Sequence, residues 1–104
     1  MVNSWEDFVK LLEDNCDKFN YTITKFWLDK EQGWYEEYIE VFKLGCCRLF
    51  INNENKEVCV VEHMGDRITS YELQIAFNCD YKRYIQIINA IFNIDLMEKN
   101  DVTR

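Results

Sequence analysis

The chain has 104 residues, of which 48% are hydrophobic and 15% are aromatic. This length predicts one domain, and this composition can fill a packed core, which excludes an intrinsically disordered chain. The formal net charge of −7 disfavours direct binding to nucleic acid or to an anionic membrane surface, because both are themselves negatively charged.

The negative charge is concentrated in the first part of the sequence. Residues 1–40 contain ten acidic and four basic side chains, whereas residues 41–104 contain nine acidic and eight basic ones. A one-sided field of this kind attracts a basic partner protein.

The cysteine pattern and the absence of targeting signals indicate the compartment. The five cysteines are an odd number and none belongs to a C-x-x-C pair, which predicts reduced thiols rather than disulfides or a zinc site. No apolar run approaches the roughly 20 residues of a membrane helix, and the N-terminal segment lacks the features of a secretory signal. We therefore expect a cytoplasmic protein that does not enter a membrane.

The first predicted element is a helix over about residues 4–19. Ser4 followed by Asp7 is typical of a helix start. The apolar residues after it recur on one helical face, and they are Trp5, Phe8, Val9, Leu12, Cys16 and Phe19. Residues 20–28 are rich in β-branched and aromatic side chains and predict a strand, followed by a turn at 29–33.

Residues 34–44 fit two structures. The sequence GWYEEYIEVF (33–42) places its large side chains at helical spacing, but its aromatic and β-branched composition favours a strand. In a strand, Trp34, Tyr38 and Phe42 would share one face with Glu36 and Glu40, whereas Tyr35, Ile39 and Val41 would share the other with Glu37. We expect the strand.

The remaining elements are predicted to be three strands and a helix. The strands cover about residues 46–52, 57–64 and 68–77, and the last alternates between apolar and polar side chains. Asn78 or Asp80 caps a helix over about 79–94, and the tail, 95–104, adds at most one loose turn. The predicted fold is α+β: an antiparallel meander of four or five strands, with the N-terminal and C-terminal helices packed on one face as a two-layer sandwich.

The sequence gives little support for a catalytic site or a metal site. The single histidine, His63, suggests a thiol enzyme that uses Cys47 or Cys59, but Cys59 and His63 would lie about 13 Å apart along one strand. Adjacent Cys46 and Cys47 would point to opposite faces of a strand and could not chelate one ion.

Paired carboxylates need a deep pocket to act as an acid and a base. The candidate pairs, Glu36 with Glu40 and Asp29 with Glu31, belong to a domain too small to offer one. We predict no catalytic residue, no cofactor and no metal.

The feature that predicts a function is the mixture of aromatic and acidic residues in the middle of the chain. Tryptophan and tyrosine are enriched in binding hot spots, and acids around them orient a basic partner. The predicted contact residues are Trp34, Tyr35, Glu36, Glu37, Tyr38 and Glu40, with Asp29 and Glu31 at the rim. The prediction is a non-enzymatic inhibitor that blocks the basic groove of a nuclease or another nucleic-acid-handling enzyme, as toxin-immunity and phage anti-defence proteins do. The alternative is a homo-oligomeric assembly module, most simply a homodimer.

Overall fold

The structure is a computed structural model that describes residues 2–30, 34–54, 56–63 and 70–97. For residues 28–30, 34–35, 62–63 and 70–73 it describes the backbone alone. The elements in chain order are α1 (Trp5–Phe19), β1 (Thr22–Lys30), β2 (Trp34–Phe42), β3 (Arg48–Asn52), β4 (Val58–His63), β5 (Ser70–Ala76) and α2 (Tyr81–Phe92).

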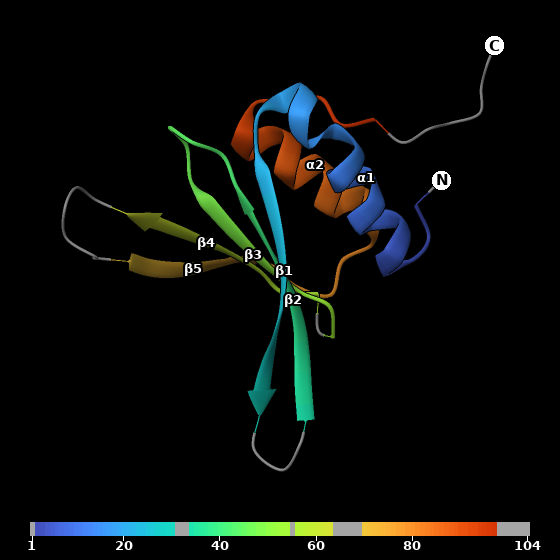
Figure 1. Cartoon of the computed structure of the whole chain (residues 1–104), viewed down its shortest axis with the longest axis vertical. Coiled ribbons are helices and arrows are strands. Elements are labelled where there is room, and N and C mark those ends of the chain that lie inside the picture. Colours follow the sequence, from blue (N-terminus) through green and yellow to red (C-terminus); the bar gives the residue numbers. More distant parts are fainter. Residues whose placement is uncertain (1, 31–33, 55, 64–69, 98–104) are drawn as a thin grey trace.

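The strands form one five-stranded antiparallel sheet in the order β1-β2-β3-β4-β5. The two helices come from opposite ends of the chain and lie side by side over one face of this sheet (Figure 1). The predicted α+β fold is therefore confirmed. Of the helices in the described part of the chain, none has the length and apolarity that crossing a membrane requires.

Both helices begin and end at capping residues. The Ser4 hydroxyl accepts a hydrogen bond from the Asp7 N–H at 3.1 Å, and Asn20 ends α1 in the left-handed conformation with φ 60°. Asp80 caps α2 by accepting from the Arg83 N–H at 2.9 Å, and Asn93 ends that helix with φ 55°. Because Asn20 belongs to the helix end, β1 begins at Thr22 rather than at residue 20.

The core lies between the helices and the covered face of the sheet. Residues from α1, the inner strands, α2 and the segment after α2 are almost fully buried, among them Phe8, Leu12, Ile39, Val41, Leu49, Ile51, Val58, Tyr84, Ile88, Phe92 and Leu96. Leu96 is buried without a further helical turn: its N–H and carbonyl bond to the side chain of Asn89 at 2.7 and 3.1 Å. The described part of the tail, up to Met97, thus contains no helical turn.

The turn between β2 and β3 is longer than predicted. Residues 43–47 leave both strands, and the Lys43 N–H bonds to the Cys47 carbonyl at 3.2 Å. Gly45 adopts φ +81°, a conformation that side chains with a Cβ rarely take. The prediction that Cys46 and Cys47 occupy opposite faces of a strand is therefore wrong.

Strand β5 does not keep its predicted alternation. A register shift at Val58 and Cys59 of β4 places Ala76 opposite Val58 and Gln74 opposite Cys59. As a result the neighbouring residues Ile75 and Ala76 both pack against the core, and Phe77 follows the strand with 57% of its surface exposed. Regular alternation over 68–77 would place Phe77 on the same face as Ile75; this part of the prediction is wrong, because β5 ends at Ala76 and the bulge changes which side chains face the core.

The β1–β2 hairpin extends beyond the rest of the sheet. The two strands pair from Thr22 opposite Phe42 to Lys30 opposite Trp34, whereas β3 pairs only with residues 38–42 of β2. Residues 27–30 and 34–37 consequently form a two-stranded ribbon that points away from the helices (Figure 1). We call this segment the projecting ribbon.

Candidate protein-binding surface

The sheet face opposite the helices carries a cluster of aromatic rings. Alternation along the strands turns Ile39, Val41, Leu49 and Ile51 toward the helices, so that their neighbours in sequence face the other way. We call this second side the open face. Its described residues on the first three strands include Phe26, Glu36, Tyr38, Glu40, Phe42, Arg48, Phe50 and Asn52.

The rings of the open face pack against one another and remain partly exposed. Phe26 stacks on Tyr38, its partner across the strands, with ring centroids 5.5 Å apart and planes 9° apart. Phe26 also meets Phe50 edge-on at 5.9 Å. Contacts of both kinds are favourable for aromatic pairs, and together they make a rigid apolar platform on a face that neither helix covers.

Glu36 is held at the edge of this platform. The Tyr38 hydroxyl donates to Glu36 Oε2 at 2.7 Å, and the Asn52 amide donates to the same oxygen at 3.2 Å. Burial, followed by the hydrogen bond to Glu36, raises the pKa of Tyr38 to about 12. Both donors are neutral, and together they fix the position of the carboxylate.

Glu37 points to the other face of the same strand. Its carboxylate accepts from the Asn53 amide at 3.0 Å, and its backbone carbonyl accepts from the Asn53 N–H at 2.8 Å. The residue opposite it in the register is Trp27, which has 59% of its surface exposed. An aromatic ring and a fixed carboxylate therefore occur together on this face as well.

Glu40 forms an ion pair across the strands. The Arg48 Nε atom lies 3.7 Å from Glu40 Oε2, with both side chains about one quarter to one third exposed. The same guanidinium lies 4.6 Å from the centre of the Phe42 ring. Arg48 thus offsets the charge of Glu40 while it stacks on an aromatic face.

The structure places the predicted contact residues on two faces rather than one. Residues 34–42 are a strand, so the helical alternative is wrong, and Glu36, Tyr38 and Glu40 do share a face. Glu37 occupies the opposite face. The backbones of Asp29, Trp34 and Tyr35 lie in the projecting ribbon; their side chains, and all of Glu31, lie outside what the structure describes.

Several residues of the surface were not predicted from the sequence. Arg48, Phe50 and Asn52 alternate within β3 and so share a face with Tyr38. This alternation was readable in residues 46–52 and would have suggested a polar and aromatic face on that strand. Asn53 and its bond to Glu37 carry no such signal.

The residues proposed for a thiol enzyme lie on β4 and in the turn that precedes β3. Cys59 is 5% exposed and belongs to β4. His63 ends the same strand, and its side chain lies outside the described atoms. Cys47 is buried beside the turn that precedes β3, and its sulfur lies 3.9 Å from that of Cys46.

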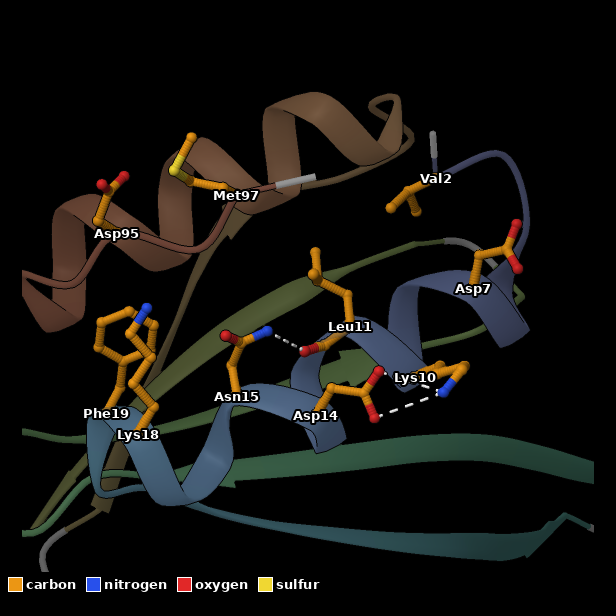
Figure 2. Close-up of a pocket in the computed structure, with 10 residues that line it drawn as sticks. All are labelled: Val2, Asp7, Lys10, Leu11, Asp14, Asn15, Lys18, Phe19, Asp95 and Met97. Carbon is orange, nitrogen blue, oxygen red and sulfur yellow. Dashed lines mark hydrogen bonds and ion pairs between the residues drawn. The ribbon is translucent and has the colours of Figure 1, made fainter. Parts of the chain in front are cut away.

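Charged and polar side chains line a groove on the helix layer. It has a volume of about 660 Å³ and runs between α1 and the segment after α2, with Val2 near one end and Phe19 at the other (Figure 2). Lys10 pairs with Asp14 at 3.1 Å across one turn of α1, and the Asn15 amide donates to the Leu11 carbonyl at 2.9 Å. These polar groups are satisfied within the helix itself.

Comparison with known proteins gives no relative for this chain: no family description matches it, and no curated protein or solved structure does either.

Proposed function

We propose that this protein is a small acidic inhibitor without catalytic activity, which blocks the basic nucleic-acid-binding groove of a partner protein in the cytoplasm. Nuclease toxins and nucleic-acid-handling defence enzymes carry such grooves, and the protein would then act as an immunity or anti-defence protein. The supporting observation is the pairing of partly exposed rings with fixed carboxylates on both faces of β2. Glu36 and Glu40 lie four residues apart on one face of β2, about 13.6 Å along the strand, and we infer that they take the place of backbone phosphates in the groove of the partner.

The hydrogen bonds of the surface favour rapid and specific docking. Because neutral donors already fix Glu36 and Glu37, less side-chain entropy is lost when a partner lysine or arginine reaches them. The net charge of −7 would steer a basic partner toward the protein. Glu40 contributes less, because Arg48 already offsets its charge.

Arg48 itself illustrates how the open face would bind an arginine. Its guanidinium stacks on Phe42 and lies beside Glu40. Tyr38 and Glu36 offer the same combination of ring and carboxylate one step along β2. A guanidinium from the partner would bind there through the same two interactions.

The test compares two variants with equal changes of charge. In E36K/E37K both lysines lie on the proposed surface, whereas in D17K/D95K they lie on exposed positions of the helix layer. The immobilised proteins are incubated with extract from the native host, and each captured basic protein is purified and tested for nucleic-acid binding. We expect wild type and D17K/D95K to abolish that binding and E36K/E37K to leave it intact.

Two results would contradict the proposal. One is equal inhibition by both double variants, which would show that only total charge matters. The other is a captured partner that still binds nucleic acid when saturated with wild-type protein.

A second candidate function is self-assembly through β1. Among the described strands, β1 is an edge of the sheet and pairs on one side, with β2, and an edge strand can pair with a second copy. Sedimentation analysis separates the two functions: a stable dimer that T24P disrupts, while E36K/E37K leaves it unchanged, favours assembly over inhibition.

A further inference from the structure

The turn between β2 and β3 brings two thiols together. Cys46 is exposed and Cys47 is 9% exposed, and their sulfur atoms lie 3.9 Å apart. The turn is closed by hydrogen bonds between Lys43 and Cys47 at 3.2 Å and between Cys46 and Lys43 at 3.0 Å. In a strand, the side chains of adjacent cysteines would point to opposite faces. In this turn, the two side chains lie on the same side of the backbone.

The geometry does not favour a direct disulfide. A disulfide needs its sulfur atoms at about 2.05 Å and its Cα atoms usually at 4.4–6.8 Å. The sulfur atoms here are 3.9 Å apart, and adjacent Cα atoms across a trans peptide are only about 3.8 Å apart. Insertion of a bridging atom between the sulfur atoms requires a much smaller movement of the turn than formation of an S–S bond.

An atom that bridges Cys46 and Cys47 can obtain only two sulfur ligands from the protein at this turn. Within the residues that the structure describes, no group of three or more His, Cys, Asp or Glu side chains could hold a metal ion. A tetrahedral zinc site, which needs four protein ligands or three and a water, is therefore not built here. A trivalent arsenic centre that already carries one organic group needs only two thiols.

We propose that Cys46 and Cys47 form a dithiol site for trivalent organoarsenicals. For a reagent R–As=O, the exposed Cys46 sulfur forms the first As–S bond and the Cys47 sulfur forms the second. The arsenic–oxygen bond breaks, and the oxygen leaves as water with the two thiol protons. Arsenic stays trivalent, so neither an oxidant nor a reductant is needed.

The site connects the sheet to the helix layer. Cys46 Sγ lies 3.4 Å from the Ile91 carbonyl of α2, where a thiol acts as a weak donor. Cys47 packs within the hydrophobic core. Closure of the ring consumes the thiol proton at Ile91 and moves the Cys47 sulfur, and we therefore expect the bound form to unfold at a lower urea concentration.

The experiment uses phenylarsine oxide in the presence of excess glutathione, which removes arsenic bound through a single thiol. Intact mass and a count of free thiols are measured on wild type and on C46S, C47S, C47A, C16S and C79S. Wild type should retain one arsenic per chain and lose two thiols. C16S and C79S should do the same, because those cysteines stand alone, whereas C46S, C47S and C47A should retain none.

C46S is the decisive variant, because Cys46 is exposed and its replacement by serine leaves the core intact. Arsenic retained by folded C46S would overturn the proposal, as would loss of only one thiol from wild type. This result is independent of the proposed inhibitory function, whose carboxylates lie on β2 and not in this turn.

Discussion

Asn52 is the centre of a hydrogen-bond network that includes Glu36 on the open face of the sheet. It is the buried polar side chain among the described residues, at 1% exposure. Its amide donates to Glu36, and its carbonyl oxygen accepts from the Glu54 N–H at 2.7 Å. The side chain thus shapes the turn after β3 while it positions a carboxylate on β2. A buried amide with satisfied hydrogen bonds stabilises one geometry over its alternatives.

Tyr38 provides a pH-dependent test of the same network. The pKa of Tyr38 in the folded protein is about 12, above the ordinary value of 10.0. A raised pKa means that the protonated phenol is favoured by folding, so its contribution is complete below pH 10 and is lost as the pH rises toward 12. Tyr38→Phe removes this contribution at every pH.

We expect wild type to be more stable than Y38F by about 1 kcal/mol near neutral pH, and the difference to shrink above pH 10. Urea unfolding of both proteins across this range measures it. Other tyrosines and the lysines titrate in both proteins, so their effects cancel in the comparison. A difference that stays constant with pH would show that the hydroxyl does not interact with Glu36 as described.

The partners of these residues could not be derived from the sequence. The alternation of side chains along a strand was enough to predict that Glu36, Tyr38 and Glu40 share one face. The contact between Glu36 and Asn52, however, depends on the register of β2 with β3, in which Tyr38 lies opposite Asn52. That register is set by the turn at 43–47, whose sequence KLGCC has a glycine where a type II turn needs one, but this glycine alone does not fix how many residues leave the two strands.

At the level of elements, composition predicted residues 34–42 better than periodicity did. Their apolar residues fit a helical stripe, yet the segment is a strand because β-branched and aromatic side chains pack well on a pleated surface. The strand pairs on both sides, and Ile39 and Val41 are completely buried in the core beneath the helices. The strand limits were less predictable, because the left-handed residue Asn20 and the turn at 43–47 both shorten the extended segments.

The start of α1 carries the clearest local signal in the chain, and it can be tested directly. Ser4→Ala removes the acceptor for the Asp7 N–H and should lower the free energy of unfolding by about 1 kcal/mol. Ser4→Asp keeps an acceptor and adds a negative charge at the positive end of the helix, so it should match wild type or exceed it. Urea unfolding followed by circular dichroism distinguishes these outcomes. Unchanged stability in Ser4→Ala would show that the cap contributes nothing.

The whole molecule is asymmetric: the two helices cover one face of the sheet and leave the other face open. The two helices meet over the covered side, where Phe8 of α1 contacts Tyr81 and Tyr84 of α2 at 5.5 and 6.1 Å between ring centroids. Tyr84 also accepts from the Cys79 N–H at 3.0 Å and donates to the Lys56 carbonyl. The sequence predicted both helices on one face, because a single sheet of this size needs two helices to bury one side.

This arrangement predicts that sheet and helices unfold together. Ile88 lies in α2 and is 1% exposed, so Ile88→Ala should lower the free energy of unfolding by about 2–5 kcal/mol. Helical circular dichroism reports on α1 and α2, and the fluorescence of Trp27, with the other tryptophans replaced by phenylalanine, reports on the β1–β2 hairpin. If the layers depend on one core, both signals should shift to the same lower urea midpoint in I88A. If only the helical signal moved, the sheet would be stable without its helix layer, and the open face would not need the covered one to keep its shape.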